Sequence, residues 1–181
     1  MQWAGLVPVG HNGVMRKLLR LDAHAKAELK QTLGVRPQVL AVAAGPHGLV
    51  AGLPDRLVYR TPDGWAQLPW HTVERGRWDS EQGVLLWTTI DGTSGSLALQ
   101  DAAPLLQLFN ERVEATIMCA QTVMLGGKRS AVVSARQDLT DPTAPLQWHV
   151  SAGEHTALAG LSDEPAVKTA MAQLRDEYDL G

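Results

Sequence analysis

Short apolar runs alternate with turn sequences over residues 39–99, and an amphipathic helical pattern follows directly. Extended segments bounded by Gly, Pro and Asp predict antiparallel strands joined by hairpins. Pro69 interrupts the segment 65–78, which is therefore expected to be one bent strand or two short ones. About seven strands are predicted in all, at 39–44, 49–53, 56–60, 65–78 (counted as two), 84–90 and 96–99.

A helix from Ala102 to Ala120 is predicted to close this sheet, with Asp101 as its N-cap. One face of the helix carries large apolar side chains, namely Leu105, Phe109, Val113 and Ile117. Since burying each such side chain is worth about 1.5–3 kcal/mol, we expect all four to be buried. The predicted fold class is therefore α+β: a bent antiparallel sheet or partly open barrel of about seven strands, closed by a helix.

The flanking segments add an N-terminal helix and a C-terminal hairpin plus helix. Residues 1–13 have no periodicity and are interpreted as a leader, whereas an apolar repeat from Val14 predicts a helix with a break near Asp22 and a stop at Gly34. Further along, residues 131–136 and 146–150 predict a hairpin, and a last helix spans 163–178. The predicted organisation is a leader and helix (1–34), a core (35–122) and a hairpin and helix packed on that core (123–181).

The order of these elements resembles the pleckstrin-homology-like fold, in which seven antiparallel strands are closed by a helix. The chain is also similar in pattern to a group of small uncharacterised actinobacterial proteins with that fold. The segments that carry the resemblance are VLAVAAGPHGLVAGLPDRLVYR, LPWHTVERGRWD, LLQLFNERVEATIM, AVVSAR and DEPAVKTAMAQLRDEYDLG. Eukaryotic members that bind phosphoinositides carry a basic cluster between their first two strands. Here that turn is Pro46-His47-Gly48, so the resemblance implies the fold rather than inositol-phosphate binding.

Composition and charge argue against several classes of function. Sixteen Lys and Arg against nineteen Asp and Glu give a net charge of −3, so no general basic field favours nucleic acid. The single cysteine, Cys119, argues against a secreted disulfide scaffold and favours a reducing cytoplasm. No apolar run approaches the roughly 20 residues that span a bilayer, and the first residues lack the order of a secretory signal. We expect a cytoplasmic protein without an integral membrane segment.

Few residues indicate catalytic chemistry. The six histidines include no HExxH motif and no close His or Cys pair, and neither GxSxG nor GxGxxG occurs. The segment Gly126–Ser130 could form an anion-binding nest, but without Walker spacing a plain hairpin turn is favoured. We accordingly expect no cofactor, no bound metal and no enzymatic activity.

The candidate interaction site is Trp70, Arg75, Arg77 and Trp78. Six tryptophans stand against one phenylalanine, and core packing is the expected role of most of them. Arginine beside tryptophan is nevertheless typical of interface hot spots, and Pro69 should leave strand backbone groups unpaired nearby. The alternative is a covered sheet face on which arginine stems lie over indole rings.

Three classes of function follow from the sequence. A non-catalytic protein-interaction or scaffold module is favoured, because the predicted sheet edge and helix groove suit an extended peptide. A small-ligand or lipid-binding module is the alternative, and an enzyme of unfamiliar motif is third. The basic residues Arg16, Lys17 and Arg20 suit an acidic membrane surface, but three bases are few, so packing of the first helix on the domain or on another subunit is favoured. A homo-oligomer is compatible with this interpretation.

Overall fold

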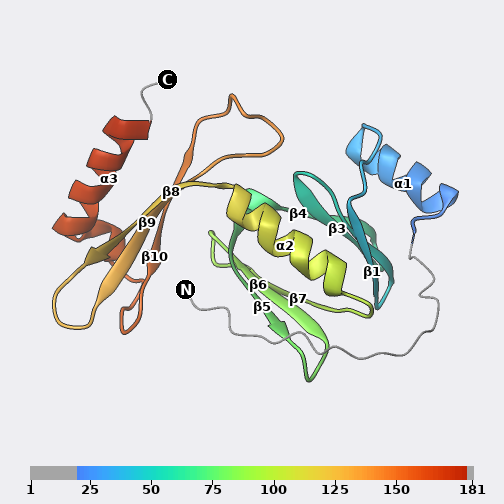
Figure 1. The fold of residues 1–181 in the computed structure, drawn as a ribbon, viewed down its shortest axis with the longest axis horizontal. Helices are drawn as coiled ribbons and strands as arrows, with labels where there is room; N and C mark the ends of the chain where they lie inside the picture. The colour runs from blue at the N-terminus through green and yellow to red at the C-terminus, as the bar shows by residue number, and fades with distance from the viewer. Residues whose placement is uncertain (1–19, 179–181) are drawn as a thin grey trace.

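The structure, a computed structural model, describes residues 20–178, which form three antiparallel sheets and three α-helices (Figure 1). The first sheet has the order β1 (Ala41–Gly45), β2 (Gly48–Gly52), β3 (Arg56–Thr61) and β4 (Gly64–Pro69). The second has the order β5 (Val73–Asp79), β6 (Val84–Thr89) and β7 (Ser94–Ala98). The third places β9 (Ser130–Arg136) between β8 (Ile117–Met124) and β10 (Gln147–Ala152).

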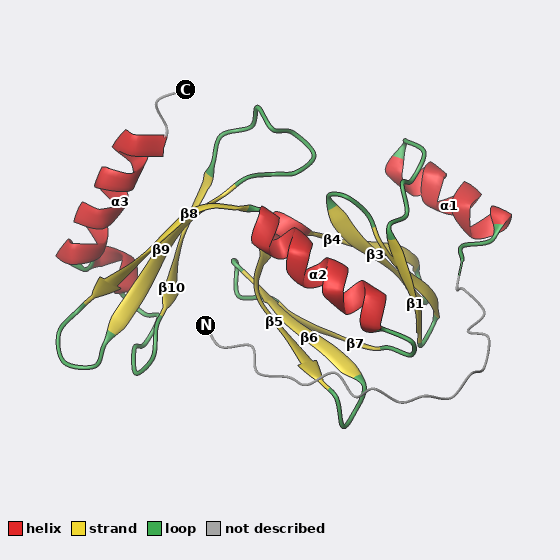
Figure 2. Cartoon of the chain, viewed as in Figure 1, coloured by secondary structure: helices red, strands yellow, loops and turns green. Residues whose placement is uncertain are grey.

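The helices are α1 (Ala23–Leu33), α2 (Ala103–Ala115) and α3 (Pro165–Tyr178), with short 3-10 turns η1 (Trp70–Thr72) and η2 (Leu161–Asp163) (Figure 2). Asp22 caps α1 by accepting a hydrogen bond from the Ala25 N–H at 2.7 Å, and Gly34 ends the helix with a φ of 72°. The predicted stop at Gly34 is therefore confirmed, and the described helix begins directly after Asp22. The predicted leader and the first turns from Val14 to residue 19 lie outside the described residues.

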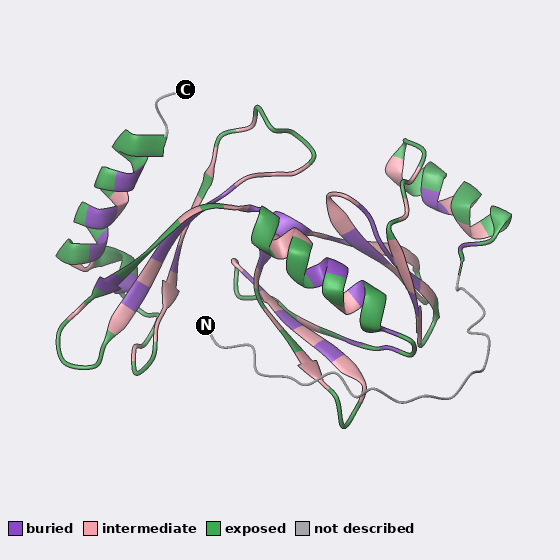
Figure 3. Ribbon diagram, in the orientation of Figure 1, coloured by how far each residue is buried: buried purple, intermediate pink, exposed green. Residues whose placement is uncertain are grey.

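The main core lies where α2 covers the first two sheets (Figure 1). Leu105 and Phe109 are 0% and 2% exposed, and Figure 3 shows exposed residues along the outer side of α2. Strand alternation supplies the facing side chains, including Val50 and Leu57 from the first sheet and Leu85 and Trp87 from the second. Gly76 of β5 is required at this contact, because a Cβ there would lie 2.3 Å from Cε1 of Phe109.

Two smaller cores complete the structure. Leu21 and Leu29 pack on the outer face of the first sheet, against Ala51, Leu53 and Val58. That sheet is buried on both faces, which explains its nearly continuous apolar strands. The third sheet has its own core with α3, formed by Val123, Ala131, Val133, Val150, Leu161, Val167, Ala170 and Leu174.

Several predictions of secondary structure need correction. The helix predicted to run to Ala120 ends at Ala115, and Ile117–Met124 is strand β8. Thr116 stops the helix, and the β-branched residues that follow pair with β9. The hairpin predicted at residues 131–136 and 146–150 is confirmed as β9 and β10, and β8 adds a third strand to it, so the predicted boundary at residue 122 falls inside β8.

The predicted single bent sheet or partly open barrel is also corrected, since the first seven strands form two separate sheets. Within the described residues, one isolated bridge, between Ala44 and Gln100, connects them. Asp101 is not the cap of α2: it has a φ of 52°, and Ala102 occupies the cap position without a side-chain hydrogen bond. Val113 and Ile117 are only partly buried: Val113 packs against the main core from the last turn of α2, and Ile117 lies past the end of the helix, in β8.

Replacing Phe109 by alanine should lower the free energy of unfolding by about 3–5 kcal/mol, through lost transfer energy and a residual cavity. Urea unfolding followed by circular dichroism measures this change. The control is Leu158→Ala, at a side chain that is 60% exposed, where we expect a change within about 0.5 kcal/mol. Equal effects of the two substitutions would contradict the assignment of Phe109 to the centre of the core.

Candidate functional site

Trp70 belongs to the core and not to the predicted interaction surface. Its side chain is 0% exposed, its indole N–H donates to the Leu53 carbonyl at 3.0 Å, and its ring meets Phe109 edge-on at 5.5 Å. A residue buried in this way cannot offer its side chain to a partner protein. Core packing, which the sequence favours for most tryptophans, applies to Trp70.

The bend after Pro69 does not leave backbone groups unpaired as predicted. Pro69 lies opposite Arg56 at the end of β4, and η1 then turns the chain into β5. The Trp70 N–H donates to the Asp55 carbonyl at 3.0 Å, and the Thr72 carbonyl accepts from the Ile90 N–H at 2.8 Å. The two sheets are therefore joined by a well-bonded corner.

Arg75, Arg77 and Trp78 lie on β5, an outer strand of the second sheet. Trp78 points inward, where it is half-buried and packs against the main core, as alternation with the outward Arg77 requires. The strand register places exposed and half-buried side chains together on the outer face of this sheet. We call this surface the arginine face; it comprises Arg75, Arg77, Leu86, Thr88, Ser94 and Ser96.

The two arginines differ in their partners. The Arg75 guanidinium donates to the Ala152 carbonyl of β10 at 2.8 Å and lies 3.8 Å from the Glu74 carboxylate, although 66% of its side chain is exposed. Arg77 is exposed and makes no hydrogen bond or ion pair with residues 20–178. Arg77 is consequently the cation of the predicted site that is available to a partner.

A polar junction connects β5 and η1 with the third sheet. Glu74 lies 3.6 Å from His149, with side chains that are 13% and 14% exposed, and His71 lies 3.4 Å from Asp138. Arg136 is 5% exposed and donates to the Thr116 hydroxyl at 3.1 Å. The sequence did not indicate this cluster, because its members are up to 78 residues apart and follow no local motif.

Charges in the junction are influenced by burial and by one another. Burial lowers the pKa of Arg136, and the Glu74 carboxylate opposes that effect. For Asp138, burial is the largest single influence and raises the pKa. Hydrogen bonds from Thr140 and the positive groups of His71 and Arg56 together outweigh it, so the pKa is lowered overall. The Asp138 carboxylate therefore favours the folded state.

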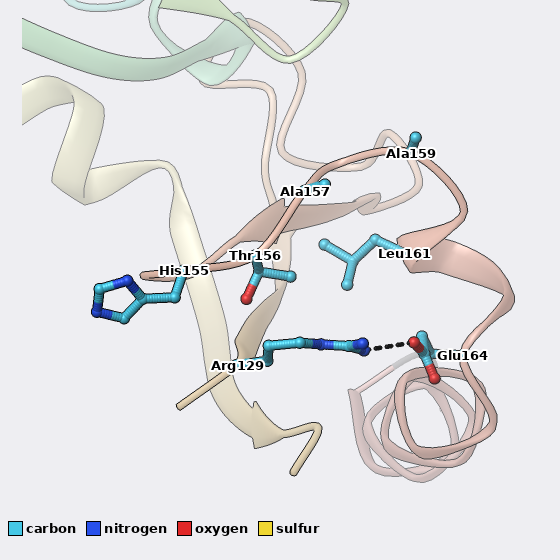
Figure 4. A pocket seen from close by; sticks show the side chains of 7 residues that line it. All are labelled: Arg129, His155, Thr156, Ala157, Ala159, Leu161 and Glu164. Carbon is cyan, nitrogen blue, oxygen red and sulfur yellow. Dashed lines mark hydrogen bonds and ion pairs between the residues drawn. The ribbon is translucent and has the colours of Figure 1, made fainter. Parts of the chain in front are cut away.

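A small cavity of about 300 Å³ lies at the start of α3, beside the turn that precedes β9 (Figure 4). Arg129 and Glu164 face each other in it at 2.6 Å, while the His155 imidazole points away from them. The segment Gly126–Ser130 is the hairpin turn between β8 and β9, as favoured from the sequence, with the Leu125 N–H bonded to the Arg129 carbonyl at 3.0 Å. Since Glu164 offsets the charge of Arg129, the cavity is a weak site for an anion.

Across residues 20–178, no group of three His, Cys, Asp or Glu side chains is placed to hold a metal ion. In the same part of the chain, no helix is both long and apolar enough to cross a membrane. No protein-family model, no curated protein and no solved structure matches this chain. Functional inference consequently rests on the surfaces described above.

Asp138→Asn should make the thermal midpoint less sensitive to acid. Because folding lowers the Asp138 pKa, the carboxylate stabilises the fold above its unfolded pKa of about 3.9, and this contribution is lost as the pH falls through the folded value. Thermal melts at several pH values from neutral to below 3.9 test this expectation. Asp63→Asn, in an exposed turn, should keep the wild-type acid dependence; an equal flattening in both variants would contradict the role of Asp138.

Proposed function

We propose that this protein is a non-catalytic protein-interaction module whose partner binds the arginine face. The observation that carries the proposal is the exposed Arg77 on an outer strand, without a hydrogen-bonding or ionic partner among residues 20–178, above half-buried Leu86 and beside small hydroxyl side chains. Arginine on a partly apolar surface is typical of interface hot spots. Serine and threonine beside it offer hydrogen-bond donors and acceptors to a polypeptide.

The sign of the charge indicates the chemistry of the partner. Arg75 and Arg77 stand on the same face, two residues apart, and the acidic residue of the strand on that face, Asp79, already accepts hydrogen bonds from the N–H groups of Glu81 and Gln82. A planar guanidinium binds carboxylates in two-point contacts. The partner is therefore a protein segment with Asp or Glu side chains.

A pleckstrin-homology-like relationship is the finer proposal for the fold. Support comes from the order of a four-stranded sheet, a three-stranded sheet and a following helix that packs on both. The connecting turn at Pro46-His47-Gly48 has no Lys or Arg, so a protein partner suits this chain better than an inositol phosphate. A small-ligand module is a weaker candidate, since the cavity beside α3 contains its own ion pair.

Alanine at both Arg75 and Arg77 should weaken capture of the partner and leave the thermal midpoint nearly unchanged, as exposed arginines contribute little to folding. Arg77→Glu alone is the sharper variant, because it reverses the free charge and keeps the Arg75 contact to β10. Affinity capture from the native cells with quantitative mass spectrometry identifies the proteins that each variant loses, and titration with the purified partner then gives the dissociation constant.

The matched control is Lys26→Glu, which makes the same charge reversal on the exposed surface of α1. A partner lost by Arg77→Glu and retained by Lys26→Glu supports the arginine face. Equal recovery of every captured protein by the wild type and Arg77→Glu would refute the assignment of this surface.

A further inference from the structure

β8 is the longest outer strand in the described part of the chain, with eight residues against five to seven in the others. It pairs with β9 on one side only. The strand has the sequence IMCAQTVM, without a charge or a proline, and Ala120, Gln121 and Thr122 in its middle are exposed. Met118 and Met124 near its ends are 52% and 64% exposed.

Four of the other five outer strands carry features that hinder further pairing, and the fifth, β7 (Ser94–Ala98), has only five residues. β5 contains Glu74, Arg75, Arg77 and Asp79, and β4 ends in proline. The edge of β1 is partly occupied by the bridge to Gln100, and Arg75 binds the Ala152 carbonyl at the end of β10. Charges, prolines and coverings of this kind normally prevent association of sheet edges. In β8 a bulge between Ile117 and Cys119 is the one such feature, and it leaves residues 119–124 regular.

The hydrogen-bonding direction of β8 follows from its turn to β9. The Leu125 N–H bonds to the Arg129 carbonyl of the neighbouring strand, and backbone groups alternate in direction along an antiparallel pair. Backbone donors and acceptors of Ala120, Thr122 and Met124 therefore point to the open edge. The side chains of Cys119 and Val123 pack against the core formed with α3, so those of Ala120 and Thr122 lie on the opposite face.

We propose that β8 pairs antiparallel with β8 of a second copy of this chain, about a two-fold axis at Gln121. Met118 and Met124 are each three residues from Gln121, so this register brings Met118 of one copy, at the bulge, near Met124 of the other. Ala120 then lies opposite Thr122, and their outward backbone groups form hydrogen-bonded pairs. The two three-stranded sheets become one six-stranded sheet with the same surface used twice.

Charge favours a second copy over an unrelated strand. When a strand pairs with its own copy across a two-fold axis, identical residues lie near one another. A charged strand would therefore place like charges close together, which destabilises the pair. β8 has none, whereas β5 has four ionisable side chains and would repel or mismatch a second β5 in most registers. The register also covers the two most exposed apolar side chains of the strand.

The test introduces charged side chains at residue 121, which lies on the proposed two-fold axis. Sedimentation equilibrium of the full chain should give a dimer of twice the 19.5 kDa chain mass. Gln121→Glu and Gln121→Lys each place like charges opposite one another and should raise the dimer dissociation constant by roughly tenfold or more. An equimolar mixture of the two variants should recover dimer as Glu–Lys pairs across the axis. Gln31→Glu, on exposed α1, should dimerise as the wild type does.

A monomeric wild-type chain at every accessible concentration overturns the proposal, including one that binds another protein along β8. A dimer that both Gln121 variants retain unchanged, or a mixture that fails to recover it, also overturns the pairing at Gln121. Far-ultraviolet circular dichroism confirms that each variant is folded. Because β8 and the arginine face share no residues, failure here leaves the proposed binding of an acidic partner unaffected.

Discussion

Close packing of the Phe109 ring is the constraint on which the arrangement of the first seven strands depends. The ring lies against Gly76 of β5, where any larger residue would clash, and meets Trp70 edge-on. Trp70 in turn is bonded to the Leu53 carbonyl of the first sheet. This side chain of α2 therefore packs between two sheets that, within residues 20–178, share one isolated backbone bridge. The arginine face is the outward face of the second of these sheets.

The third sheet is attached by a different kind of interaction. The apolar side chains of this sheet pack against α3. Its contacts with β5 and η1 are made by polar side chains, which include Glu74, His149 and Asp138. Removing one partner of such a pair would leave the other charge partly buried and uncompensated, which is costly. The Arg75 guanidinium is partly engaged by its hydrogen bond to the Ala152 carbonyl, whereas Arg77 is exposed.

The outer strands divide by chemistry into two types of surface. β5 carries charged side chains, which contribute to an exposed sheet face. β8 carries no charged side chain and exposes unpaired backbone groups along its outer edge. A charged face suits side-chain recognition of an oppositely charged protein, while an uncharged edge suits main-chain pairing. The two surfaces lie on different sheets, so an assembly through β8 is compatible with a partner on the arginine face.

The sequence by itself determined the elements with strong local signals. Turn residues and alternating apolar positions located the strands from Ala41 to Ala98, and caps located α1, because these signals act between neighbouring residues. It extended α2 to Ala120, into the first half of β8, since a short apolar stretch fits both a helix and a strand, and pairing with β9 decided between them. The burial of Trp70, the separation of the sheets and the junction of Glu74 with His149 were decided only by tertiary structure. Each depends on contacts between residues distant in the chain, which no local pattern encodes.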